Sequence, residues 1–161
     1  MSHVAVIKTE VKSLEALKAA CKRLGLEFLE GQTTYRWFGT WVKDYNQPDA
    51  AYQNGVKPES YGKDSLHAIG IPDNDQSYEI GVLQNTNSDG QPIEGFKLVW
   101  DFWSGGHGLD KFVGGKGAEK LVAGYAVEAF REEAVAQGYA ITETTDENGY
   151  IQVEALDYAA A

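Results

Sequence analysis

The chain has 161 residues, of which 43% are hydrophobic and 24% are charged, a size and composition typical of one globular domain. Its 24 acidic and 14 basic residues give a formal net charge of -10. A field of this sign repels phosphate backbones and anionic lipid surfaces, so we expect no nucleic acid and no membrane as a partner.

The cellular compartment is inferred from apolar runs and from cysteine. No apolar run reaches the ~20 residues that span a bilayer, and residues 1–4 do not begin a secretory signal. The single cysteine, Cys21, excludes an internal disulfide bond, and its place on an apolar helical stripe favours a buried hydrophobe over a reactive thiol. We therefore expect a cytoplasmic protein, with residues 1–158 forming one domain and 159–161 a tail.

The first elements are a strand, a helix and a second strand. Residues 4–11 are rich in β-branched side chains and short enough for a strand. Ser13 is a typical N-cap, and Gly25 is a typical residue to follow a helix C-terminus. Between them, apolar side chains recur at three- and four-residue steps, which predicts one buried helical stripe: Leu14, Leu17, Cys21 and Leu24.

The next part of the chain is aromatic and then irregular. Residues 26–42 have a β-type composition, whereas residues 44–65 contain prolines, glycines and mostly polar neighbours. A loop of this length is uncommon inside a compact domain, which favours a mobile or a functional segment. Its three tyrosines favour packing against the rest of the domain.

Three strands and a helix are predicted after this loop. The strands cover residues 66–71, 78–85 and 95–103, with a strong turn signal at 87–90. A glycine-rich stretch, residues 104–117, leads to a predicted helix over 118–137. This helix has five apolar residues that we expect to face the core: Val122, Ala126, Ala129, Phe130 and Ala134.

The last element is a hairpin whose register follows from parity. Ile141, Ile151 and Val153 are all odd-numbered, so they share a face only if the connecting loop has an odd number of residues. The shortest such loop is 147–149. We expect Gly149 at positive φ and Asn148 in the right-handed region.

These elements run in the order β-α-β-(loop)-β-β-β-α-β-β. Strands outnumber helices and most are linked as hairpins, which predicts an α+β fold. We expect a single, mostly antiparallel β-sheet with two helices packed on one face.

The glycine-rich stretch is one candidate ligand site. His107, Asp110 and Lys116 lie in it just before a predicted helix, and helix N-termini bind anions. The stretch is not a P-loop, because Asp110 and Gly117 stand where that motif needs Gly and Ser or Thr. Two interpretations stay open, a flexible connector and a ligand-binding loop.

The aromatic residues are a second candidate site. Tyr35, Trp37 and Trp41 share odd parity, so they form either a partner-binding surface on the uncovered face of the sheet or a second layer of core. On the strand 95–103, we expect Trp100 to pack inward and Asp101 to face solvent.

Catalytic and metal chemistry have little support in this sequence. The histidines His3, His67 and His107 have no ligand spacing, so we expect no metal and no cofactor. His67 is expected to be a half-buried structural residue. No serine lies in a nucleophile motif or beside an obvious base.

Eight short segments spread over both ends and the centre of the chain resemble a known family. They are residues 1–3 (Met-Ser-His), 7–9 (Ile-Lys-Thr), 14–18 (Leu-Glu-Ala-Leu-Lys), 24–25 (Leu-Gly), 78–82 (Tyr-Glu-Ile-Gly-Val), Tyr125, 137–139 (Gln-Gly-Tyr) and 148–151 (Asn-Gly-Tyr-Ile). Together they are similar to the ycf-thirty-five-like family of cyanobacteria and chloroplasts, also called domain of unknown function 1257. The chain departs from this pattern at residues 44–65 and 104–117, which are longer here.

The resemblance implies an accessory role. Members of that family tend to be encoded near AAA+ ATPases, which makes such an ATPase a candidate protein partner, and the family brings no catalytic residues. We therefore expect a non-catalytic accessory or protein-interaction module. The alternatives are a small-ligand-binding protein or enzyme that uses the loop 104–117, and a structural component of a phage or another assembly.

Overall fold

The computed structural model describes residues 3–39 and 56–157, and its strands form two separate antiparallel sheets. The five-stranded sheet has the order β1-β5-β4-β3-β2, and β6 pairs with β7. The elements are β1 (Val4–Val6), α1 (Leu14–Arg23), β2 (Glu27–Glu30), η1 (Pro58–Ser60), β3 (His67–Gly70), β4 (Ile80–Thr86), β5 (Pro92–Asp101), η2 (Trp103–Gly106), α4 (Leu109–Val113), α5 (Glu119–Ala136), β6 (Tyr139–Thr145) and β7 (Ile151–Asp157).

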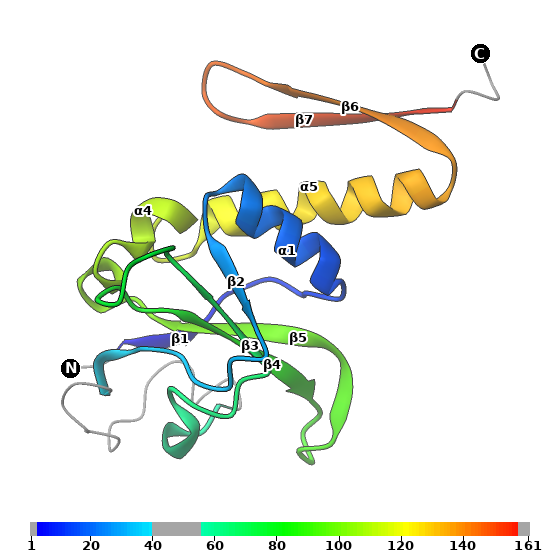
Figure 1. Cartoon of the computed structure of the whole chain (residues 1–161). Helices are drawn as coiled ribbons and strands as arrows, with labels where there is room; N and C mark the ends of the chain where they lie inside the picture. Colours follow the sequence, from blue (N-terminus) through cyan, green and yellow to red (C-terminus); the bar gives the residue numbers. More distant parts are fainter. Residues whose placement is uncertain (1–2, 40–55, 158–161) are drawn as a thin grey trace.

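The predicted α+β class, with a mostly antiparallel sheet and two helices on one face, is confirmed, but the strands form two sheets where a single sheet was predicted. Figure 1 shows α1 and α5 side by side above the five-stranded sheet. The hairpin β6–β7 lies on the other side of α5 and forms a sheet of its own. None of the helices in the described residues is long and apolar enough to cross a membrane.

Helix α1 follows its sequence pattern closely. The hydroxyl of Ser13 accepts a hydrogen bond from the backbone N–H of Ala16 at 3.1 Å, which caps the first turn as predicted. Leu17 and Cys21 are buried, and the outer members of the stripe pack against the same core. Gly25 follows the C-cap with φ of 74°, a conformation that glycine adopts without strain.

Helix α5 does not bury the face that we predicted. Its buried residues are Leu121, Gly124, Tyr125, Val127 and Ala134. Of the predicted core face only Ala134 belongs to this set. Val122 and Ala129 are half-buried, Ala126 is exposed, and Phe130 is 44% exposed.

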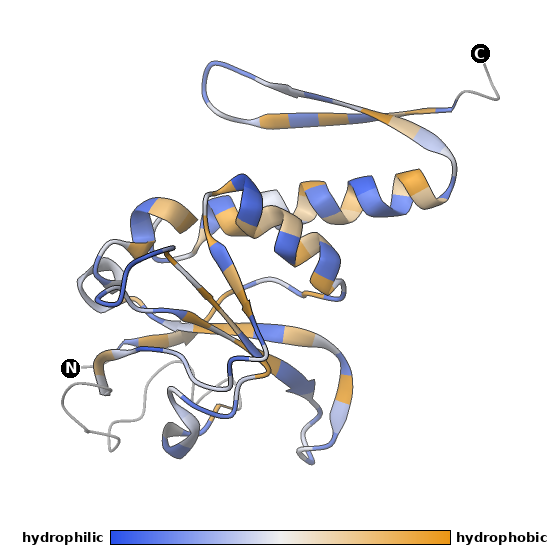
Figure 2. Cartoon of the chain, in the orientation of Figure 1, coloured by the Kyte–Doolittle hydropathy of each residue, from blue (hydrophilic) through white to orange (hydrophobic). Residues whose placement is uncertain are grey.

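The reason is that α5 packs between two partners. Gly124 allows the side chain of Ala20 in α1 to approach closely, and Tyr125 also faces the N-terminal part of the chain. On the hairpin side, Arg131 donates a hydrogen bond of 2.7 Å to the carboxylate of Glu143 in β6. Figure 2 shows hydrophobic and hydrophilic residues alternating along the whole of α5.

The aromatic residues predicted as a partner-binding surface form a second core layer, the other interpretation that the sequence left open. Tyr35 and Trp37 are each 2% exposed and pack with Tyr61, Leu83 and Val99 on the sheet face opposite the helices. They lie in an irregular segment, because β2 ends at Glu30. Trp41 and residues 44–55 of the predicted loop lie outside the described residues.

This second layer is held by a buried carboxylate. Glu79 is 3% exposed and accepts a hydrogen bond of 2.9 Å from the backbone N–H of Arg36. The guanidinium of Arg36 in turn donates to the carbonyl oxygens of Ser77 and Asn74, each at 2.8 Å.

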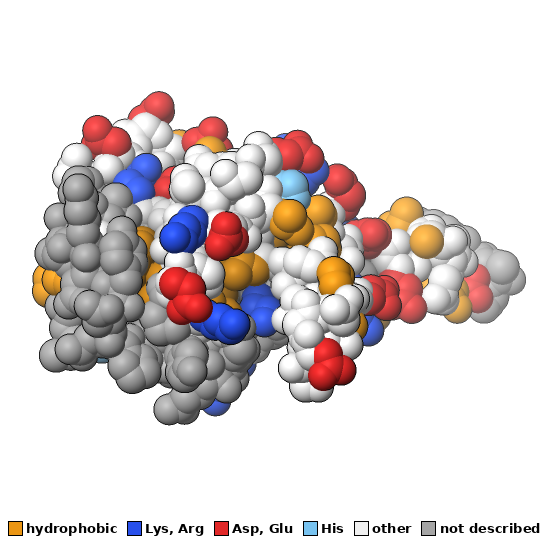
Figure 3. Space-filling view, turned by 90° about the horizontal axis from the view of Figure 1, so that it is seen from below, with side chains coloured by type: hydrophobic (Ala, Val, Ile, Leu, Met, Phe, Trp, Pro, Cys, Tyr) orange, Lys and Arg blue, Asp and Glu red, His pale blue; other side chains and the backbone are white. Residues whose placement is uncertain are grey.

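Seen from below in Figure 3, acidic and basic side chains are interspersed over the described part of this face.

The terminal hairpin has the predicted register. Ile141 pairs with Ala155 and Thr145 with Ile151, so the odd-numbered side chains share one face. Asp146 and Tyr150 close a three-residue loop, in which Gly149 has φ of 85° and Asn148 does not adopt positive φ.

Candidate binding groove

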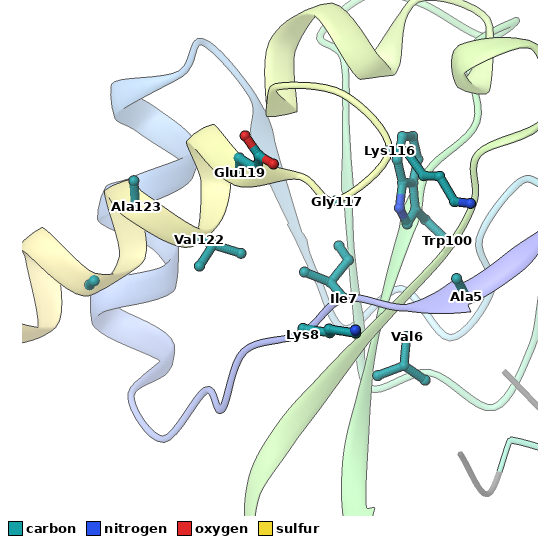
Figure 4. Close-up of a pocket in the computed structure, with 11 residues that line it drawn as sticks. Ala5, Val6, Ile7, Lys8, Trp100, Lys116, Gly117, Glu119, Val122 and Ala123 are labelled. Atoms are coloured by element: carbon teal, nitrogen blue, oxygen red, sulfur yellow. The ribbon is translucent and has the colours of Figure 1, made fainter. Parts of the chain in front are cut away.

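A cavity of about 710 Å³ lies where the edge strand β1 meets the first turns of α5, and we call it the β1–α5 groove (Figure 4). Its wall comes from three parts of the chain that are separated in the sequence: the first strand, the end of β5, and the glycine-rich stretch with the helix that follows it. The lining residues are Ala5, Val6, Ile7 and Lys8 from β1 and the residues after it, Trp100 from β5, Lys116 and Gly117 from the glycine-rich stretch, and Glu119, Val122, Ala123 and Ala126 from α5.

The groove follows from the end of the sheet. Strand β1 pairs only with β5, and Ala5 lies opposite Trp100 in the register. Val4 belongs to the second core layer, whereas Ile7 belongs to the core beneath the helices. Figure 4 shows Ile7 and Val122 pointing toward each other across the groove, with Trp100 and Lys116 at one end.

The indole of Trp100 is the most informative polar group in the groove. Trp100 is fully buried, and within the described part of the chain its Nε1–H has no hydrogen-bond partner. Leaving a buried donor unpaired costs about 1–3 kcal/mol, so such a group in a native structure requires an explanation. An acceptor on a bound molecule would provide one, because this side chain forms part of the groove wall.

Charged side chains stand at the edge of the groove. Lys8 and Lys116 are exposed, and the Nζ of Lys116 lies 4.4 Å from the ring centroid of Phe102, a cation–π contact. Glu119 also contributes to the wall, but Figure 4 shows its carboxylate pointing away from Trp100 and Lys116. At the Trp100 end, the groove therefore combines apolar walls with positive charge.

The glycine-rich stretch is an ordered turn that shapes this end of the groove. Residues 104–108 all have positive φ, including Ser104 at 51° and His107 at 53°. Gly106 lies against the ring of Trp100, where an added Cβ would come within 3.0 Å of the ring. The stretch also contains the short helix α4, so its first ten residues have regular local structure.

The three predicted ligand residues of this stretch are not in one place. Only Lys116 lines the groove. The exposed ring of His107 packs edge-on against Tyr78 and Trp103, at centroid distances of 4.8 and 5.8 Å. The carboxylate of Asp110 lies beside Gly105, whose hypothetical Cβ would come within 2.6 Å of it.

Asp101 is buried, which contradicts the prediction that it faces solvent. Its exposed fraction is 0%, and its carboxylate accepts backbone N–H bonds from His3 at 3.0 Å, Trp103 at 2.9 Å and Phe38 at 3.1 Å. These three bonds join the start of the chain, the end of β5 and the segment after Trp37. Asp101 is therefore a structural clamp.

Other titratable side chains also have structural explanations. Burial raises the pKa of the Cys21 thiol to about 12, as expected for an inert core residue. Burial, with a contribution from Asp101, raises the pKa of Tyr78 to about 12.

The described histidines and acids give no sign of a metal site. Nδ1 of half-buried His67 accepts a hydrogen bond from the backbone N–H of Gly31 at 2.9 Å, which confirms its structural role. Among residues 3–39 and 56–157, no cluster of three His, Cys, Asp or Glu side chains could hold a metal ion.

Comparison with protein-family models, with curated proteins and with solved structures found no match to this chain. The groove itself is thus the main guide to function. It offers apolar contact, one buried N–H donor and two ammonium groups, which together suit an apolar group that carries an acceptor or an anion. Among the groove residues, the sequence indicated only Lys116 as a ligand residue, and it predicted Trp100, Val122 and Ala126 as core residues. The period-2 pattern of residues 4–8 could have indicated that Ala5 and Ile7 share a face.

Proposed function

We propose that this protein is an accessory protein-interaction module, and that its partner docks along the β1–α5 groove and the uncovered side of α5. The observation that carries the proposal is an apolar stripe of α5 that the rest of the described chain covers only in part. It consists of Val122, Ala126, Ala129 and Phe130.

The stripe continues the groove along the helix. Val122 and Ala126 line the groove, and Phe130 lies two turns beyond Val122, about 12 Å further along the helix axis at 1.5 Å per residue. A small ligand that fills the groove would leave Phe130 in water. A protein segment would cover the groove and the stripe together, and contiguous exposed apolar surface of this kind marks interaction sites.

The other two sides of α5 are occupied inside this chain. Gly124 and Tyr125 face α1 and the residues before it, while Arg131 binds β6. The remaining side is covered only in part: Phe130 lies beside Tyr139 and Ala155 of the hairpin and is still 44% exposed, so a partner can reach it. The resemblance to the ycf-thirty-five-like family supports an AAA+ ATPase as the class of partner to be tried first.

The test is site-specific photo-crosslinking in the native host. A benzoylphenylalanine at Ala126 should crosslink a defined protein, whereas the same residue at exposed Gln152 on the hairpin should not. The captured protein, purified, should then lose at least about tenfold in affinity for the Ala126→Glu variant, because the substitution places a charge in an apolar contact. Equal crosslinking at both positions, or unchanged affinity of the variant, would refute the docking surface.

One observation favours a second function, the small-ligand binder that the sequence left open. Lys116 of the glycine-rich stretch and Trp100, whose buried Nε1 has no hydrogen-bond partner in the described residues, line the same groove. A purified chain that retains a small organic acid in native mass spectrometry, and loses it in Lys116→Gln, would favour this function over the interaction module.

A further inference from the structure

We infer that the Trp100 end of the β1–α5 groove recognises the free C-terminal carboxylate of the partner, with the terminal apolar side chain held between Ile7 and Val122. This inference rests on the proposed function and names the chemistry of the docking segment. It is independent of the residues of α5 beyond Ala126.

The first argument is the unpaired donor. Nε1 of Trp100 is buried without a hydrogen-bond partner in the described residues, and Trp100 forms part of the groove wall (Figure 4). A carboxylate oxygen is an acceptor that can satisfy this N–H, and hydrogen bonds to an ionised acceptor are about twice as strong as neutral ones. The site is thus built to gain from an anionic acceptor.

The second argument is charge. The chain carries a net charge of -10, yet Lys8 and Lys116 both line this groove. Lys116 is positioned over Phe102, which leaves its ammonium at the Trp100 end. The ammonium of Lys116 at the Trp100 end, together with that of Lys8 beside Ile7 on the groove wall, favours an anion at a place where the overall field of the protein opposes one.

The third argument is shape and apolarity. A volume of about 710 Å³ suits a short peptide end better than a single ion. Ile7 and Val122 point into the groove from opposite sides, and the exposed stripe of α5 leads away from it. A chain that ends at Trp100 can therefore extend along Val122 and Ala126 toward Phe130.

The experiment uses the full chain labelled with ¹⁵N and two peptides that differ only in their last group. The probe is an acetylated peptide of two alanines followed by two leucines with a free carboxylate, and its control is the same peptide amidated. The acid should shift the indole N–H resonance of Trp100, assigned by its loss in Trp100→Phe. It should also bind at least about tenfold more tightly than the amide.

Variants separate the contributions of the groove. Trp100→Phe, Lys8→Gln and Lys116→Gln should each weaken binding of the acid severalfold and leave binding of the amide nearly unchanged. Lys63→Gln, at an exposed lysine that does not line the groove, is the matched control and should change the binding of neither peptide. Since Lys8 is exposed, its variant keeps the test valid even if Trp100→Phe does not fold.

The outcomes distinguish this inference from the proposed function. Equal binding of acid and amide, or no binding of either, would overturn carboxylate recognition while the crosslinking test at Ala126 could still succeed. Binding of octanoate without binding of the peptide would also overturn it, because the site would then take a small organic acid. Binding of the acid peptide together with a negative crosslinking result would leave the groove chemistry standing and refute the longer docking surface.

Discussion

Helices α1 and α5 both carry an apolar stripe at helical spacing, but α1 is much more strongly amphipathic than α5, and the two stripes are buried to different extents. In α1 the stripe through Leu17 and Cys21 is the buried side of the helix. In α5 the stripe through Val122 and Ala126 is half-buried or exposed. The apolar residues of α1 gather on one side, whereas α5 has apolar residues on more than one side.

The difference lies in how many neighbours each helix has. Helix α1 covers the sheet and meets α5 on one side, so its single apolar stripe matches its buried side. Helix α5 is held by α1 on one side and by the hairpin on another, and much of that contact is polar. Arg23, Glu128, Arg131 and Glu143 form a group of ion pairs that joins α1, α5 and β6. An apolar stripe outside such contacts is available to a partner.

The largest loss of stability should come from a substitution in the apolar stripe of α1. Leu17 is 0% exposed, so Leu17→Ala should lower the free energy of unfolding by about 2–5 kcal/mol, through lost burial and the cavity that remains. Urea denaturation measures this loss. Leu66→Ala, at a leucine that is 40% exposed, is the matched control and should cost less than half as much. Equal losses in the two variants would mean that the α1 stripe is not the core.

The next effect tests the side of α5 that faces the N-terminal part of the chain. The hydroxyl of Tyr125 accepts the backbone N–H groups of Lys12 at 2.8 Å and Ser13 at 3.2 Å. Tyr125→Phe leaves these two donors unpaired and should cost about 1–3 kcal/mol of unfolding free energy. Tyr150→Phe, at a side chain that is 74% exposed, should cost almost nothing. A Tyr125→Phe variant as stable as the parent would show that this contact does not hold α5.

A smaller loss of stability is expected from a substitution that weakens the contact between α5 and the hairpin, its second neighbour. Hydrogen bonds from Arg23, with a contribution from Arg131, lower the pKa of Glu143. A lowered folded-state pKa means that the ionised group stabilises the fold above its unfolded pKa of about 4.3, and that this stability is lost as pH falls through the folded value. Glu143→Gln should therefore cost about 1 kcal/mol at pH 7.

The pH dependence separates charge from packing. The difference between the parent and Glu143→Gln should shrink as pH falls below 4, because protonation removes the same charge from the parent. Denaturation curves at pH 7, 5 and 3.5 would show this trend. Glu154→Gln, on the exposed face of the same hairpin, should give no difference at any pH. A gap that stays constant with pH would assign the Glu143 effect to packing.

Local signals explain what the sequence predicted well. Ser13 marks the start of α1 through its side-chain hydroxyl and Gly25 marks its end through its positive φ, and the parity of Ile141 and Ile151 determines the hairpin loop. The burial of Asp101 was missed because its three N–H donors come from residues far along the chain or at a strand end. The β1–α5 groove was missed for a related reason, since Ile7, Trp100 and Val122 meet only through the fold.

The smallest effect on stability belongs to the uncovered stripe, and it completes the comparison of the two helices. Ala126 is exposed, and glutamate is nearly as good a helix former as alanine, so Ala126→Glu should change the unfolding free energy by less than about 0.5 kcal/mol. The same substitution at Ala20, which is fully buried against Gly124, should prevent stable folding because it buries an unpaired charge. Circular dichroism and urea denaturation of both variants measure this contrast. At Ala126, partner binding can therefore be tested without a change in stability, because the Ala126→Glu variant should fold like the parent and bind the partner more weakly. A large loss of stability in Ala126→Glu would mean that the stripe is part of the core after all, and would remove the basis for a docking surface there.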